Sequence, residues 1–365
     1  MGTRSNPNRR VHPGVPVNPF RRANRRRALA ALAAAAVAVT AAAVLSGFHT
    51  TLHEITPPGS KQTSELTTAQ VVGIRTWTPT ADVSVTSDVT YGTADDGARL
   101  DLDVCSPKAA AAPGELRRGI LSIHGGSWAR GDKANTDWRD VCEWLASEGF
   151  VAFSVNYRLA PAALFPAGID DVTAAAEWVR EHAADYGIDP GLIGAFGGSA
   201  GGNLAALLGM RGSGALDTGS RVAAVAELSG PVDITADGLA SASPLVHQIV
   251  QNYLGCTDLA SCPQATQASA TTFVDPSDPP VFIGHSESEF IPLNESQEFA
   301  AKLEAAGVPH QLVVVPGINH SIGTLDASMR AQVADFFHSA LGGPAAPAHP
   351  GAPASPADGS VSAAP

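Results

Sequence analysis

The sequence predicts an α/β protein with a mostly parallel central sheet and helices on both faces. Short apolar runs of strand length alternate along the chain with stretches of helical periodicity, which is typical of parallel sheets. Segments rich in Gly, Ser and His follow several of these runs. Because such sheets bind ligands at the carboxyl ends of their strands, we expect the functional site at that edge.

The N-terminal segment predicts export rather than fold. Residues 1–27 carry eight arginines and no acidic residue, and residues 28–47 form an uncharged apolar run. A basic segment followed by an apolar one indicates a signal peptide over residues 1–47, or a membrane anchor if residues 28–47 are retained. Both alternatives place the rest of the chain outside the cytoplasm, secreted or anchored, and only the second involves a membrane.

One folded domain is expected over residues 81–341. Residues 48–80 are polar and predict a linker, and residues 342–365 form a Pro/Ala-rich tail that cannot bury enough surface to fold. The 365 residues carry a net charge of −12, and beyond the eight arginines 35 acidic residues face 15 basic ones. Such an acidic domain repels phosphate backbones, so nucleic acid is excluded as a partner.

The elements follow in chain order. Strands are expected at seven apolar runs: Leu100–Val104, Ile120–Ile123, Val151–Val155, Leu192–Phe196, Val222–Leu228, Val281–Ile283 and Leu312–Val315. Helices are expected at four stretches: Asp171–His182, Asn203–Leu208, Glu295–Ala306 and Met329–Leu341. Gly307 closes the third of these helices, as glycine often does.

Four cysteines, an even number in an exported chain, predict two disulfides. Cys256 and Cys262 are six residues apart in a polar stretch, and Cys105 and Cys142 lie near strand and helix ends. We therefore expect the pairs Cys256–Cys262 and Cys105–Cys142. No Cys-x-x-Cys pair or histidine cluster accompanies them, so neither a metal site nor a cofactor is predicted.

The strongest chemical signal is the segment Gly197–Gly201, which has the pattern Gly-x-Ser-x-Gly between an apolar run and a helical stretch. In this strand–turn–helix context the pattern is typical of a nucleophile elbow. Glycines are needed because the turn has no room for side chains beside the serine, whose backbone is strained. Ser199 is the candidate nucleophile, and the N–H of Ala200 is a candidate donor to an oxyanion.

A second signal, His124–Trp128 with the sequence His-Gly-Gly-Ser-Trp, closes an earlier apolar run. Its two glycines let backbone N–H groups turn toward a neighbouring site, and acyl transfer needs such donors for its tetrahedral oxyanion. We assign these donors to Gly126 and Ser127. His124 and Gly125 are expected to shape this loop, with His124 holding it through hydrogen bonds rather than reacting.

The two segments, with Asn156–Pro161 between them, resemble the α/β-hydrolase fold serine esterases of the hormone-sensitive-lipase-like and feruloyl-esterase-like groups. The resemblance extends over Phe165–Asp171 and reaches Gly317–Ser321. It implies a catalytic triad in the order nucleophile, acid, histidine and a small cap insertion at about residues 235–280. The family usually has a third glycine where this chain has Ser127, and a backbone donor survives that change.

The histidine follows from this order. His320, in the loop after the last apolar run, matches the family's catalytic histidine. The rivals have less suitable positions, since His310 precedes a strand, His338 lies on the final helix and His285 lies on the acid loop itself.

The acid is where the chain departs from the family. The resemblance places an Asp four residues before Pro292, but Ser288 occupies that position and has no charge to stabilise an imidazolium. We favour Glu289, because a longer side chain compensates for one residue of offset. Glu287 and Asp233 remain alternatives.

The sequence thus predicts a serine hydrolase that cleaves small carboxylic esters through an acyl-enzyme, with a small-molecule acyl ester as its partner. An acyltransferase, amidase or formamidase would use the same groups. The alternative from another class is a non-catalytic binding or cell-surface protein that keeps the fold, and Ser288 at the acid position is its support.

Overall fold

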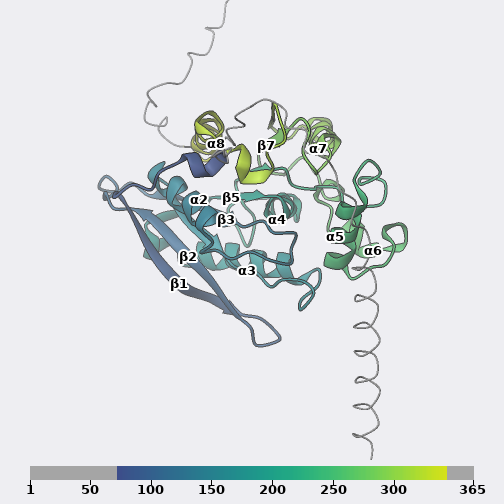
Figure 1. Ribbon diagram of the computed structural model, residues 1–365. Helices are drawn as coiled ribbons and strands as arrows, with labels where there is room; N and C mark the ends of the chain where they lie inside the picture. Colours follow the sequence, from purple (N-terminus) through teal and green to yellow (C-terminus); the bar gives the residue numbers. More distant parts are fainter. Residues whose placement is uncertain (1–71, 343–365) are drawn as a thin grey trace, which may run out of the picture. The chain divides into compact units, whose positions relative to one another are not determined.

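The computed structural model describes residues 72–342, which form an eight-stranded sheet covered by helices (Figure 1). Its order is β1-β2-β4-β3-β5-β6-β7-β8; β1 and β2 run antiparallel to their neighbours, and the other pairs are parallel. The strands are β1 Val83–Thr93, β2 Arg99–Pro107, β3 Arg117–Ile123, β4 Val151–Val155, β5 Ile188–Gly198, β6 Ala224–Leu228, β7 Val281–Ser286 and β8 His310–Val315. The predicted mostly parallel sheet is confirmed, and all seven expected strands are present.

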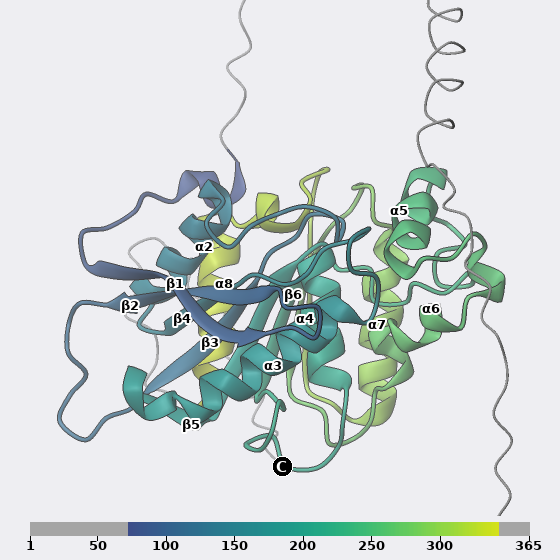
Figure 2. The same cartoon turned by 90° about the horizontal axis from the view of Figure 1, so that it is seen from below.

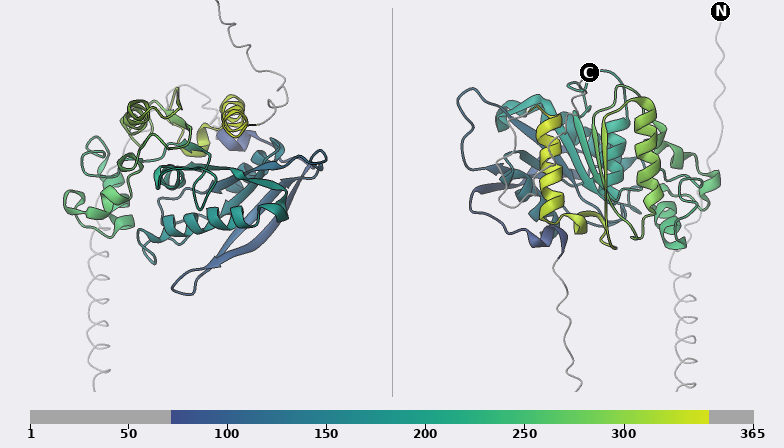
Figure 3. Two further views of the ribbon diagram at one scale, coloured as in Figure 1. Left: turned by 180° about the vertical axis from the view of Figure 1, so that it is seen from behind. Right: turned by 90° about the horizontal axis from the view of Figure 1, so that it is seen from above.

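The helices cover both faces of the sheet. They are α2 Thr136–Ser147, α3 Ala167–Glu181, α4 Ala200–Met210, α5 Pro244–Leu254, α6 Pro263–Gln267, α7 Leu293–Ala306 and α8 Ala327–Ala340. Buried side chains of α2 and α8 share one apolar core, and those of α3, α4, α5 and α7 share the other. Figure 2 shows α3 and α4 over the sheet, and Figure 3 shows α7 and α8 on either side of the last strands.

One strand, β1, and three helices, α2, α5 and α6, were not predicted from the sequence. β1 is an edge strand whose residues are mostly exposed, so it has no apolar run that would reveal it. α2 buries two tryptophans, Trp138 and Trp144, yet its polar residues obscure the pattern. Gly307 does close α7, with a φ of 73° in the left-handed region that glycine adopts at little cost.

The folded part begins earlier than residue 81, the predicted start. Gly73–Thr76 forms a 3-10 turn in which Ile74 is 2% exposed, and Arg75 makes a bidentate pair with Asp137 on α2. The predicted signal or anchor, the first part of the linker and the tail after residue 342 lie outside the described residues. Within residues 72–342, no helix is long and apolar enough to span a membrane.

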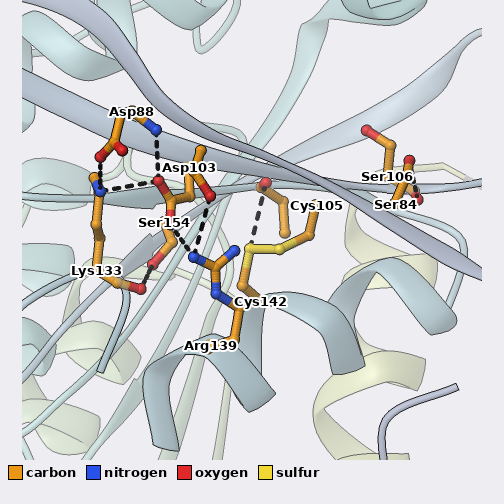
Figure 4. Close-up of a disulfide and its surroundings, with 11 residues drawn as sticks. Ser84, Asp88, Asp103, Cys105, Ser106, Lys133, Arg139, Cys142 and Ser154 are labelled. Atoms are coloured by element: carbon orange, nitrogen blue, oxygen red, sulfur yellow. Dashed lines mark hydrogen bonds and ion pairs between the residues drawn. A yellow bond between two sulfur atoms is a disulfide. The ribbon is translucent and has the colours of Figure 1, made fainter. Parts of the chain in front are cut away.

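Both predicted disulfides are present. Cys105 on β2 is bonded to Cys142 on α2, with their Cα atoms 5.8 Å apart (Figure 4). Cys256 follows α5 and is bonded to Cys262, which precedes α6. The first disulfide ties a helix to the sheet, and the second closes a short loop in the segment that was expected to be a cap.

A buried ion cluster lies beside the first disulfide (Figure 4). The side chain of Asp103 on β2 is 1% exposed and pairs with Arg139 of α2 and with Lys133, whose Nζ is 2.9 Å from Asp103 Oδ1. Lys133 Nζ is also 2.7 Å from Asp88 Oδ1 on β1. Because Lys133 belongs to the loop that follows His124–Trp128, this cluster anchors that loop to the edge of the sheet.

Candidate active site

Ser199 lies at the sharp turn between β5 and α4. Its φ of 57° and ψ of −126° are strained for a residue with a side chain. A Cβ at Gly197 would lie 2.1 Å from the carbonyl oxygen of Gly201, and one at Gly201 would lie 2.0 Å from that of Ile123. Only glycine fits at these positions, so the sequence pattern and the strained turn have the same steric cause.

The half-buried Ser199 opens onto a pocket of about 560 Å³. The lining comes from the His124–Trp128 segment, the loop after it, the start of α2 and the His320 loop. These residues are Gly125, Gly126, Ser127, Arg130, Gly131, Asn135, Asp137, Trp138, Ser199, Phe290, His320, Ser321 and Ile322. Ser199 and His320 therefore face the same space from two different ends of the sequence.

His320 follows β8 and turns one edge of its ring toward a buried carboxylate. Its Nδ1 is hydrogen-bonded to Oε2 of Glu289. Within the described residues its Nε2 has no hydrogen-bond partner, although it is buried, and the ring edge is covered by Phe290 at 4.4 Å between ring centroids. The free Nε2 is the nitrogen that remains for Ser199 and substrate.

The three candidate acids lie in very different surroundings. The Glu289 side chain is fully buried, whereas Glu287 is exposed. Asp233 lies elsewhere and accepts from Thr235 Oγ1 at 2.6 Å and from Thr271 Oγ1 at 2.9 Å. Of the three, the structure brings only Glu289 into contact with His320.

Backbone pairing explains why Glu289 turns inward. The N–H of Glu287 donates to the carbonyl of Val315 at 3.0 Å, and the N–H of Ser288 donates to that of Gly317 at 3.0 Å. These bonds keep the end of β7 paired with the loop that leads to His320. The turn at residues 287–288 then directs Glu289 beneath that loop.

The His124–Trp128 segment lies directly against the elbow. A Cβ at Gly125 would be 2.7 Å from the carbonyl oxygen of Gly198 and 3.2 Å from Cβ of Ser199. Gly126 has a φ of 132° and Ser127 a φ of 57°. Ser127, which replaces the family's third glycine, thus adopts a left-handed conformation that glycine would adopt at a lower cost.

The three candidate oxyanion donors are unpaired. In residues 72–342, the N–H groups of Gly126, Ser127 and Ala200 donate to no other group. That of Ala200 lies at the first turn of α4, where the helix leaves N–H groups without intrahelical acceptors and favours negative charge. Free donors beside a nucleophile are what a developing oxyanion requires.

His124 has a different environment from His320. It is 1% exposed, its ring stacks on Tyr157 at 4.4 Å, and its Nδ1 donates to the carbonyl oxygen of Gly125 at 2.9 Å. Burial lowers the pKa of His124, so the ring is neutral. Its contacts hold the glycine loop in place.

A second, much smaller pocket also borders Ser199. Trp128 stacks on Tyr253 of α5 at 4.3 Å and nearly parallel, and forms one wall of this pocket. Apolar side chains complete the lining: Pro231, Val246, Ile249, Val250, Phe290 and Ile291. The remaining cavity is only about 10 Å³, the room that about one water molecule requires.

Two buried carboxyl groups near the elbow were not found from the sequence. Glu227 lies within the otherwise apolar strand β6, and its Oε2 accepts from the N–H of Gly230 at 2.7 Å. Glu295 of α7 accepts from the N–H groups of Val232 and Asp233. Burial raises the pKa of each glutamate to about 8, so both favour the protonated form. Glu227 could have been noticed in the sequence because it is the one charged residue in this apolar run.

His285 is a further residue whose place the sequence did not reveal. From the sequence alone it is only a rival of His320, but it is fully buried near the end of β7 and does not line the pocket of Ser199. Its Nε2 lies 3.1 Å from Oε1 of Glu289. Within residues 72–342, no group of three or more His, Cys, Asp or Glu side chains is placed to hold a metal ion.

Known proteins share this architecture. Residues 102–303 match the BD-FAE family, which is more than half of the chain. Esterase LipQ of Mycobacterium tuberculosis is 30% identical over 257 residues, which are 68% of this chain and 59% of that protein. The chain therefore spans less than two thirds of the length of this curated relative.

Solved structures agree with the match. A truncated carbohydrate esterase from gut microbiota has a TM-score of 0.62 and 28% identity, covering 72% of this chain and 99% of that one. Esterase 2 of Thermogutta terrifontis, phosphonylated by sarin, has a TM-score of 0.60 and 27% identity, covering 72% and 96%. The same esterase with butyrate bound has a TM-score of 0.58. The chain belongs to the BD-FAE family of α/β-hydrolase fold esterases.

Proposed function

We propose that this protein is a serine carboxylesterase in which Ser199, His320 and Glu289 form the triad. The observation that carries the proposal is the contact between the buried Glu289 carboxylate and Nδ1 of His320, whose free Nε2 borders the pocket of Ser199. The phosphonylated relative supports a nucleophilic serine in this fold. Ser288 at the expected acid position was the argument for a non-catalytic protein. That argument no longer applies, because the neighbouring Glu289 contacts His320.

The mechanism follows from these positions. Ser199 Oγ attacks the ester carbonyl while Nε2 of His320 takes its proton, and the same nitrogen then protonates the leaving alcohol. The N–H groups of Gly126, Ser127 and Ala200 bind the tetrahedral oxyanion. Glu289 keeps the proton of the neutral imidazole on Nδ1 and stabilises the imidazolium. A water activated by His320 then hydrolyses the acyl-enzyme.

The two pockets that border Ser199 favour esters with a small acyl group. The apolar pocket beside Trp128 has little free volume, so long acyl chains would need side chains to move. The wider pocket has room for the alcohol part. A relative that holds butyrate supports short carboxylic acids as the acyl class.

We also propose that the protein acts outside the cytoplasm. The arginine-rich and apolar sequence of residues 1–47 and the two disulfides support this location, because disulfides persist in oxidising compartments.

The test uses p-nitrophenyl esters from acetate to octanoate and a fluorophosphonate probe. We expect kcat/KM to fall steadily with chain length and the probe to label wild-type protein but not Ser199→Ala. The variant should lose about 10⁴- to 10⁶-fold in kcat at an unchanged Tm. A wild-type protein that is neither labelled nor active on any ester would refute the proposal, and an active Ser199→Ala would refute the nucleophile.

A further inference from the structure

We propose that His285 is the positioning residue of the triad, holding the Glu289 carboxylate so that it faces His320; this inference rests on the proposed function. The glutamate lies between two imidazoles. Oε2 contacts Nδ1 of His320, and Oε1 lies 3.1 Å from Nε2 of His285. The triad Ser199, His320 and Glu289 is thus followed by one further buried ring, that of His285.

The Glu289 carboxylate has no other polar support. Within residues 72–342, no backbone N–H donates to it, whereas Glu227 and Glu295 each accept backbone N–H groups at 2.7 to 2.9 Å. A fully buried carboxylate without donors is costly. His285 is the one group besides His320 within ion-pair distance of this carboxylate.

His285 can fill this role because its own ring is fixed. Its Nδ1 contacts the hydroxyl of Ser296 on α7 at 2.8 Å, and its Nε2 contacts the carbonyl oxygen of Ile291 at 3.0 Å. A carbonyl can only accept, so Nε2 carries the proton and Nδ1 accepts from Ser296. The N–H is directed at Ile291, and Oε1 of Glu289 lies beside it, next to the positive end of the N–H dipole.

Burial keeps His285 neutral. It lowers the pKa of the ring by more than the neighbouring Glu289 and the hydrogen bond to Ile291 raise it, and His320 lowers it further. The ring is 0% exposed, and its other neighbours, Ser296 and the Ile291 carbonyl, are uncharged. A neutral ring with its proton on Nε2 places the positive end of an N–H dipole beside Oε1, which has no hydrogen-bond partner within the described residues, and does not compete for the charge that His320 needs.

The need for such a residue follows from the choice of acid. A glutamate has one more rotatable bond than the aspartate usual in the family, so its carboxylate has more orientations to lose on burial. Holding Oε1 restricts these orientations and leaves Oε2 toward His320. Removal of His285 should therefore affect the reaction step rather than substrate binding, since the ring does not line either pocket beside Ser199.

The experiment is a double-mutant cycle with His285→Phe and Glu289→Gln, using p-nitrophenyl acetate and the rate of labelling by a fluorophosphonate. His285→Phe should lower kcat about three- to tenfold, the size expected for one neutral hydrogen bond, because the ring N–H points to Ile291 and only borders Oε1 of Glu289; KM should change less than about twofold. In the Glu289→Gln background the same substitution should cost less than about twofold, because the residue it acts through has lost its charge.

Ser296→Ala is the second arm and serves where His285→Phe lowers Tm markedly. It frees the outer side of the His285 ring and keeps the ring itself, so a smaller loss of about two- to threefold is expected, again absent in the Glu289→Gln background. Equal losses in both backgrounds, in whichever arm folds, would overturn the inference and assign His285 a structural role. A wild-type protein without esterase activity or labelling would refute the proposed function instead.

Discussion

Replacing Glu227 by Gln should change how stability depends on pH. Glu227 is 0% exposed beneath the elbow, and its Oε2 would lie 3.2 Å from a Cβ at Gly202. Burial is the main cause that raises its pKa from 4.5 to about 8, and the neighbouring Glu289 and Glu295 add to it. The folded protein thus keeps a proton on Glu227 that the unfolded chain releases above pH 4.5.

The sign and slope follow from this proton. Between pH 4.5 and about 8, unfolding releases one proton from Glu227, so this residue makes the free energy of unfolding fall as pH rises. The slope for one proton is about 1.4 kcal/mol per pH unit. Gln cannot ionise, so Glu227→Gln should gain about 3 kcal/mol relative to wild type between pH 5 and pH 7, as an upper bound.

Urea unfolding monitored by tryptophan fluorescence at constant ionic strength, in steps from pH 5 to pH 8, measures this difference. Glu287→Gln is the matched control because it removes an exposed glutamate, and its curve should run parallel to that of wild type. Glu295→Gln should repeat the effect, since the pKa of Glu295 is also raised to about 8. Parallel curves for wild type and Glu227→Gln would refute the conclusion that Glu227 is protonated in the folded protein.

Three further outcomes are expected. Glu289→Gln should lower kcat by about 10⁴-fold with little change in KM, as for loss of the triad acid in a serine protease. Glu287→Gln should lower kcat less than about tenfold. If steady-state kinetics show the reverse pattern, the triad acid is not Glu289. Removing the Cys105–Cys142 disulfide, whose cysteines are 37 residues apart, should cost about 4 kcal/mol in chemical denaturation. Lys133→Met should cost about 3 kcal/mol, because it leaves the buried carboxylate of β2 with one partner fewer, and an unchanged Tm would contradict this.

Much of the fold and part of the site could be predicted because the signals are local. The buried strands are short apolar runs, and β1 escaped notice because an exposed edge strand has none. Ser199 could be found because its turn excludes side chains at the adjacent glycines. The disulfide pairs followed from spacing and from the ends of predicted elements, and both are present.

The residues behind the pocket could not be predicted in the same way. His285 and Glu227 lie inside apolar strands, where the sequence indicates burial but not which polar atoms meet. The contact of His285 with Glu289 depends on the turn after β7, which brings together two residues that are four positions apart in the chain. The raised pKa of Glu227 depends on how completely water is excluded, which is a property of the packed protein.

The sequence by itself determined the buried strands of the sheet and located the elbow of Ser199 and the glycine loop, since apolar runs and glycine patterns can be recognised within a short stretch of chain. Only the tertiary structure decided which carboxylate meets His320. Glu287 and Glu289 are alike in sequence, but hydrogen bonds from residues 287 and 288 to Val315 and Gly317 set the turn that exposes one and buries the other. Pairing between distant segments fixes where β7 ends and the turn begins, and the turn then sets the direction of each side chain.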